Sequence, residues 1–196
     1  MKSKLYFFVG FLSISVANEA FAAKGLIIKL DVTDLAQDTI NKKIRVPAGM
    51  HEKSARHHVT VGYIEENLPD DQMHKLGKDL IAQLKTIFPV STPNNHIKFD
   101  VQEAARPFGK PVVLIPVNEV DLRDVNKKIN TIVQHSNHQL NELTQPNNYI
   151  PHMTLSPKRN DAQYLPGLNQ AIATHKKQRN RQLFFKLVKF NYTVIK

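Results

Sequence analysis

The chain has 196 residues, of which 41% are hydrophobic and 22% charged, which excludes a disordered or fibrous protein and provides enough apolar residues for one folded domain. Its formal net charge of +10 favours contact with anionic molecules, such as those that carry phosphate, although charge alone identifies no site. The absence of cysteine excludes disulfides, thiol nucleophiles, thiolate metal ligands and a lipid-modified cysteine.

The first residues have the pattern of an export signal. A basic start is followed by an apolar run from Leu5 to Val16 and by a small-x-small sequence at residues 20–22. We therefore expect residues 1–22 to be a signal peptide and residues 23–196 to form one exported domain, periplasmic or secreted. The apolar run is shorter than the roughly 20 residues of a membrane-spanning helix, so no stable membrane insertion is expected after cleavage.

Residues 25–32 (GLIIKLDV) are apolar and β-branched, which predicts a strand. Residues 57–64 (HHVTVGYI) alternate with a period of two, which predicts a second strand. On this strand we expect His58, Thr60 and Gly62 to share one face. Val59, Val61 and Tyr63 are then expected on the other face, which packs into the core.

The rest of the chain alternates between helical and strand patterns. Apolar residues recur at intervals of three and four after Pro69, and later segments alternate between turn residues and β-forming runs. These patterns predict a helix over residues 73–87, a hairpin of 97–104 with 112–117, a helix over 122–143, a strand over 149–155, a helix over 165–177 and a strand over 183–195.

This order predicts an α+β protein. A short strand followed by a helix and one or more strands occurs nearly twice along the chain. We therefore expect bilobal, pseudo-duplicated antiparallel sheets with flanking helices, in which the two short strands meet across a cleft.

Each of those short strands contains a His-x-Thr-hydrophobic tetrapeptide. We name His58-Val59-Thr60-Val61 the first motif and His152-Met153-Thr154-Leu155 the second motif. Residues two apart on a strand project from the same face, so each motif presents an imidazole beside a hydroxyl. The His-x-Thr match selects His58 over the adjacent His57.

Two histidines and two threonines suit the cleavage of a phosphodiester. Imidazole titrates near neutral pH, so one histidine can take a proton while the other, protonated, gives one to the departing oxygen. The hydroxyls of Thr60 and Thr154 can bind the non-bridging phosphate oxygens. This chemistry requires no metal and no cofactor. The sequence leaves open which of His58 and His152 is the acid.

The two motifs resemble the signature of the two-histidine (2H) phosphoesterase superfamily, which includes the bacterial RNA 2′,3′-cyclic phosphodiesterases, also called 2′-5′ RNA ligases. The second motif follows Tyr149-Ile150-Pro151, which is similar to the aromatic-x-Pro lead-in of the bacterial branch. The resemblance implies metal-independent hydrolysis of 2′,3′-cyclic or 2′,5′-linked ribose phosphates, with His58 and His152 catalytic and Thr60 and Thr154 binding phosphate.

The expected partner is therefore a nucleotide or an RNA with a cyclic phosphate or a 2′,5′ linkage, bound by a monomer. Within the same chemistry, a transesterifying ribonuclease and a nucleotidyl ligase are alternatives. An alternative from another class is a secreted protein or effector that binds nucleotides or RNA without hydrolysing them.

Other residues allow further interpretations. Tyr149 could stack on a base or pack in the core. His135 with His138, or His51 with His57 and His58, could share a metal, although the chain has no cysteine to complete either group, and we expect no metal site. Basic residues at 158–159 and 176–181 could follow a nucleic-acid backbone or form solvated surface.

Overall fold

The computed structural model describes residues 24–44, 57–88, 97–101, 105–107, 112–114, 116, 119–156, 165–178 and 184–196. These residues form a mixed α+β fold, in which helices flank a curled antiparallel sheet, so the expected class is confirmed. The signal peptide expected at residues 1–22 lies outside the described residues. No helix in the described part of the chain is long and apolar enough to cross a membrane.

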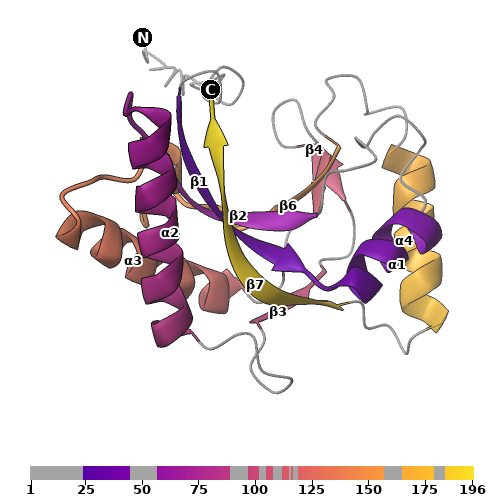
Figure 1. Ribbon diagram of the computed structural model, residues 1–196. Coiled ribbons are helices and arrows are strands. Elements are labelled where there is room, and N and C mark those ends of the chain that lie inside the picture. The colour runs from indigo at the N-terminus through magenta and orange to yellow at the C-terminus, as the bar shows by residue number, and fades with distance from the viewer. Residues whose placement is uncertain are drawn as a thin grey trace, which may run out of the picture.

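Seven strands of the described residues belong to one sheet, and all neighbouring pairs are antiparallel. They are β1 (Gly25–Val32), β2 (His58–Glu65), β3 (Ile97–Asp100), β4 (Arg106–Pro107), β5 (Val112–Leu114), β6 (Met153–Ser156) and β7 (Phe184–Ile195). Their order across the sheet is β3-β7-β1-β2-β6-β5-β4. The sheet curls strongly (Figure 1). An isolated bridge joins Val101, after β3, to Pro116, after β5.

The strands that carry the two motifs, β2 and β6, are hydrogen-bonded neighbours in this sheet. We expected them to meet across a cleft between lobes, whereas the structure joins them directly. The hairpin expected between residues 97–104 and 112–117 is wrong. In the described part of the chain β5 pairs with β4, whose residues were expected to lie in the loop, and β3 pairs with β7 at the edge of the sheet.

One face of the sheet forms the main core. Alternate residues of β1 are fully buried on this face: Leu26, Ile28, Leu30 and Val32. Two predicted helices, α2 (Asp70–Ile87) and α3 (Glu119–His135), lie on the same side of the sheet in Figure 1. The close approach of α2 to β7 depends on Gly77, because an added Cβ there would lie 2.5 Å from the ring of Tyr192.

The helix predicted over residues 122–143 is shorter in the structure, because α3 ends at His135. Asn137 has a φ of 60°, the left-handed conformation in which many helices end. The N–H of His138 then donates to the carbonyl of Val133 at 3.0 Å. The chain continues through a short 3₁₀ helix, η1 (Glu142–Thr144), toward the second motif.

The helix α1 (Asp34–Lys43) was not predicted from the sequence. It begins after Thr33, whose hydroxyl oxygen accepts the N–H of Ala36 at 3.1 Å, as an N-cap residue does. The predicted helix over residues 165–177 is present as α4 (Leu165–Gln178). Both helices lie at the end of the sheet away from α2 and α3 in Figure 1.

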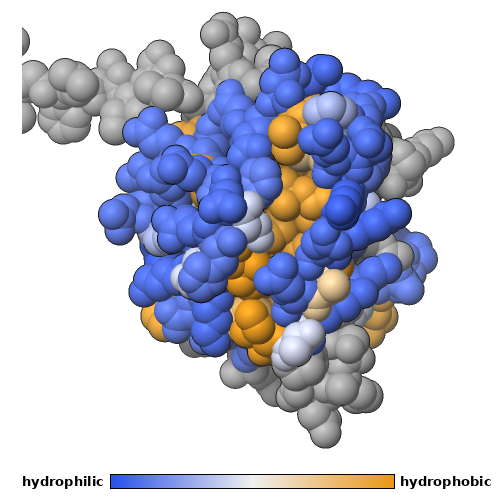
Figure 2. Space-filling view, turned by 60° about the vertical axis from the view of Figure 1, so that its left-hand side comes forward, coloured by the Kyte–Doolittle hydropathy of each residue, from blue (hydrophilic) through white to orange (hydrophobic). Residues whose placement is uncertain are grey.

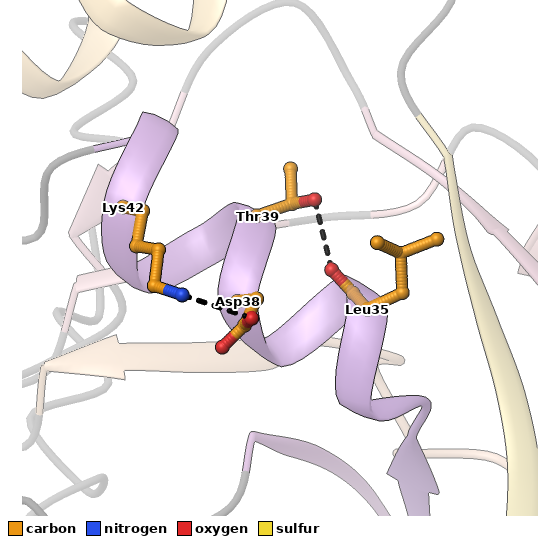
Figure 3. Close-up of polar contacts among 4 residues, drawn as sticks. All are labelled: Leu35, Asp38, Thr39 and Lys42. Atoms are coloured by element: carbon orange, nitrogen blue, oxygen red, sulfur yellow. Dashed lines mark hydrogen bonds and ion pairs between the residues drawn. The ribbon is translucent and has the colours of Figure 1, made fainter.

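Two contacts run along the outer side of α1 (Figure 3). The hydroxyl of Thr39 donates to the carbonyl of Leu35 at 2.9 Å, and Lys42 pairs with Asp38 at 3.0 Å. Both contacts are exposed to solvent, where a single ion pair adds little stability. The position of α1 therefore depends on its buried residues, Ala36, Ile40 and the following Ile44.

The surface of the side that carries α2 and α3 is mainly hydrophilic, with an apolar band running between the hydrophilic areas (Figure 2). Hydrophobic side chains of the fold that are only partly buried include Leu76, Phe88 and Tyr192. Apolar area of this kind is normal on folded proteins and identifies no function by itself.

Candidate active site

The two motifs meet at the pairing of β2 with β6. Val59 pairs with Met153, and both side chains are fully buried. The strands are antiparallel, so one step from this pair in opposite directions places His58 opposite Thr154 and Thr60 opposite His152. Each histidine therefore lies across from the threonine of the other motif.

These four polar residues share an accessible face of the sheet. His58, Thr60, His152 and Thr154 are all partly exposed, whereas the apolar residues that alternate with them are buried. We name the side of the sheet that they share the motif face. The structure thus brings together all four residues that the sequence singled out for acid–base catalysis and phosphate binding.

The alternation of β2 is interrupted at Val61. Gly62 pairs with Ile28 of β1, and Thr60 pairs with the next residue, Lys29. Val61 is therefore an extra residue, a β-bulge, and the faces of the strand change places after it.

This bulge makes two expectations wrong. Gly62 faces the core instead of sharing the face of His58, because an added Cβ there would lie 3.1 Å from the side chain of Ile129 in α3. Tyr63 pairs with Ile27, which lies on the face of β1 opposite to its core residues, so Tyr63 belongs to the motif face. Tyr63 is nevertheless buried, as expected of a packing residue.

His152 is held by the chain just before it. Its Nδ1 lies 2.8 Å from the carbonyl oxygen of Ile150. A carbonyl can only accept, so Nδ1 carries the hydrogen and Nε2 is the nitrogen that gains or loses a proton near neutral pH. The pKa of His152 is lowered, first because burial disfavours the charged ring and also because of the charge of His58, while the bond to Ile150 opposes this shift.

His57 has a different environment from His58. Its side chain is buried, with ring nitrogens 3.3 Å from the carbonyl of Thr154 and 3.4 Å from Oδ1 of Asn41. Its backbone N–H donates to Oε1 of Gln37 at 2.7 Å. His57 therefore connects α1 to both motif strands, and the histidine that lies beside Thr60 on the motif face is His58.

Tyr149 packs in the interior. It is 2% exposed, and its hydroxyl donates to the carbonyl of Thr60 at 2.9 Å. Arg123 of α3 donates to the carbonyl of Tyr149 at 2.5 Å. Of the two interpretations of Tyr149, the structure favours packing over stacking on a base, because the buried ring offers no open face to a ligand.

Two residues of β1 extend the motif face and were missed from the sequence. Lys29 pairs with Thr60, and Asp31 pairs with His58. Asp31 is only 4% exposed, and its Oδ2 accepts a hydrogen bond from Asn191 of β7 at 3.1 Å. The signal was present in the sequence as two charged residues spaced two apart within an otherwise apolar strand.

Two histidine groups of the sequence could in principle share a metal. Within the described part of the chain, no three histidine, aspartate or glutamate residues are grouped to hold one. His138 lies beyond the end of α3 and contacts Glu66 at 2.8 Å, so it does not share a helix face with His135. His51 lies outside the described residues.

The basic segments are described only in part. Residues 158–159 and 179–181 lie outside the described residues. Lys176, at the end of α4, donates to the carbonyl of Val101 at 3.3 Å, while Lys177 is exposed. The idea that these segments follow a nucleic-acid backbone stays a prediction.

Comparison of the chain with models of protein families and with curated proteins found no match.

Proposed function

We propose that this chain is a two-histidine phosphoesterase that hydrolyses 2′,3′-cyclic phosphates or 2′,5′-linked ribonucleotides. The observation that carries the proposal is the antiparallel pairing of Val59 with Met153, from which we infer a crossed arrangement, with His58 opposite Thr154 and His152 opposite Thr60. Two distant tetrapeptides thereby form one group of two imidazoles and two hydroxyls. The net charge of +10 suits an anionic substrate.

In the proposed reaction His152 is the base. Its lowered pKa favours the neutral ring, and its Nδ1–H is held by Ile150, so Nε2 takes a proton from the attacking water. The resulting hydroxide oxygen bonds to phosphorus as the bond from phosphorus to the ribose oxygen breaks. Protonated His58 gives its proton to that oxygen. Exchange of protons with solvent then restores both histidines.

Thr60 and Thr154 bind the phosphate in this scheme. Each hydroxyl lies beside one histidine along its own strand and across from the other histidine. Hydroxyl donors at these positions can bond to non-bridging oxygens, whose negative charge grows in the transition state. The scheme uses two histidines and two threonines and requires no metal or cofactor.

The proposal also covers the fold, the oligomeric state and the export of the protein. We assign it to the bilobal, pseudo-duplicated 2H fold, and the antiparallel meeting of two short motif strands is what a local two-fold relation between halves would produce. The protein is proposed to be an exported monomer, released from residues 1–22 by signal cleavage.

The proposal is tested by incubating the purified protein with 2′,3′-cyclic nucleotides, 2′,5′-oligoadenylate and ADP-ribose cyclic phosphate in the presence of EDTA. We expect ring opening or cleavage that EDTA does not inhibit. Either His58→Ala or His152→Ala should lower kcat/KM by about 10²–10⁴-fold, the usual contribution of a general acid or base. The far-UV circular dichroism of both variants should match that of the wild-type protein.

His74→Ala is the matched control, because His74 is an exposed histidine of α2 that contacts Tyr192 rather than the motif strands. It should retain wild-type activity. Activity that survives either motif change, or that EDTA abolishes, would contradict the mechanism. Saturable binding of a nucleotide without turnover would instead favour the non-hydrolysing binding protein or effector.

A further inference from the structure

Asp31 is a buried carboxylate beside the first motif. It pairs across the β1–β2 ladder with His58, so the two side chains start from adjacent points on the same face of the sheet. Only 4% of Asp31 is exposed. Its Oδ2 accepts a hydrogen bond from Asn191, and its Oδ1 has no hydrogen-bond partner among the described residues.

A carboxylate oxygen that is buried without a donor is costly, because folding removes the water that solvated it. Buried polar atoms of this kind often have a functional explanation. The residue directly across the β1–β2 ladder from Asp31 is His58. Directly opposite side chains have Cβ atoms about 4.5–5.5 Å apart, a span that an imidazole and a carboxylate bridge.

We propose that Asp31 is a positioning residue, which orients the ring of His58 and stabilises its protonated form so that His58 serves as the acid. The inference rests on the proposed function and deepens it, because it names a residue that keeps His58 protonated for its role as the acid. His58 has a carboxylate opposite it, whereas His152 has a backbone carbonyl at its Nδ1 and a lowered pKa.

Other charged or titratable groups belong to the strands around Asp31. Lys189 of β7 pairs with Asp31 across the β1–β7 ladder, and its side chain is exposed. None of the ion pairs among the described residues joins Lys189 to Asp31. The remaining groups are Lys29 on the same strand, His57 and His58 at the start of β2, and His152 before β6. Of these remaining groups, His58 is directly across the β1–β2 ladder from Asp31.

The test is Asp31→Asn, which keeps the shape and can still accept the hydrogen bond from Asn191. We expect kcat to fall about 10–100-fold and KM to change less than about twofold, because Asp31 does not touch the substrate. The basic limb of the pH–rate profile should move to lower pH, since the acid loses its proton sooner without the carboxylate. Asp31→Glu should restore part of kcat.

Asp100→Asn is the matched control, because Asp100 is a strand carboxylate that pairs with Lys98 on the distant strand β3. Its kcat and pH profile should equal those of the wild-type protein. If Asp31→Asn lowers the melting temperature but leaves kcat and the pH profile unchanged, Asp31 has only a structural role and the inference is wrong.

A second measurement does not depend on turnover. The ring signals of His58, assigned by comparison with His58→Gln, are followed by NMR as a function of pH. Asp31→Asn should lower the pH at which these signals titrate by about one unit. An unchanged titration would overturn the inference even if the enzyme is active. A lack of hydrolysis by the wild-type protein, with the titration shifted as expected, would overturn the proposed function alone.

Discussion

The two His-x-Thr motifs have the same residue pattern but are held in place by different contacts. The first motif belongs to β2, which pairs with β1 along its length and with β6 on its other side. The second motif belongs mainly to the four-residue strand β6, and His152 precedes that strand. Its histidine is oriented by Ile150 rather than by a strand ladder.

The difference shows that equivalent residues in one site can depend on different parts of the fold. The first motif is positioned by backbone pairing, and a carboxylate lies across from its histidine. The second motif depends on the segment between α3 and β6, to which side chains of α3 donate hydrogen bonds. Changes to those side chains should therefore affect His152 more than His58.

Among changes that separate the supports of the two motifs, Asn126→Ala should lower the free energy of unfolding the most. Asn126 is fully buried in α3, and its side-chain N–H₂ donates to the carbonyls of Val61 at 2.9 Å and Thr144 at 2.8 Å. Its removal leaves two buried carbonyls without this donor. We expect the free energy of unfolding to fall by about 3 kcal/mol, measured by urea denaturation.

Lys127→Ala is the control for Asn126→Ala. Lys127 is the next residue of α3, and it forms an exposed ion pair with Asp124 at 3.6 Å. Its removal should change the free energy of unfolding by less than about 0.5 kcal/mol. Equal effects of the two changes would show that the bonds of Asn126 do not support the segment before the second motif.

A smaller effect is expected from Tyr149→Phe. The change keeps the buried ring but removes the hydroxyl that donates to the carbonyl of Thr60, a bond from the lead-in of the second motif to the backbone of the first. We expect a loss of about 1 kcal/mol in the free energy of unfolding. Because the bond joins the two motifs, kcat/KM for a cyclic nucleotide should also fall several-fold.

Tyr192→Phe is the matched control, because the hydroxyl of Tyr192 contacts His74 of α2 at 3.3 Å instead of a motif strand. Its activity should remain at the wild-type level. If Tyr149→Phe is also fully active, the contact between the two motifs has no part in positioning the site.

The smallest expected effect is on the pH dependence of stability. The pKa of His152 in the folded protein is below its ordinary value of 6.5, so the unfolded chain takes up this proton at a higher pH than the folded protein does. The contribution of His152 to stability is therefore full above pH 6.5 and is lost as the pH falls through 6.5 toward the lowered pKa.

His152→Asn should make the free energy of unfolding fall less steeply than in the wild-type protein as the pH is lowered from about 7.5 to about 5. Urea denaturation at several pH values measures the two slopes. Equal slopes would mean that burial of His152 does not disfavour its charged form.

The local parts of the fold could be predicted from the sequence because they depend on neighbouring residues. The period of two in the first motif correctly placed His58 and Thr60 on one face, and the spacing of apolar residues correctly predicted α2. Both patterns report which side chains need burial.

Other features depend on long-range contacts or on the backbone conformation of one residue, and the spacing of apolar residues in the sequence does not report either. The bulge at Val61 reverses the faces of β2 and moves Tyr63 to the motif face. Asn137 ends α3 earlier than its apolar spacing suggests. The direct pairing of β2 with β6, and the pairing of Asp31 with His58, are set by the order of the strands, which local periodicity does not determine.

The central claim is that the two motifs form one acid–base site, and a double-variant comparison tests it most directly. The rates of hydrolysis of a 2′,3′-cyclic nucleotide are measured for His58→Ala, His152→Ala and the protein with both changes. Residues that act in the same catalytic cycle are not additive, so the double variant should be about as slow as either single variant. Losses that multiply, or a single variant that keeps wild-type activity, would contradict the account.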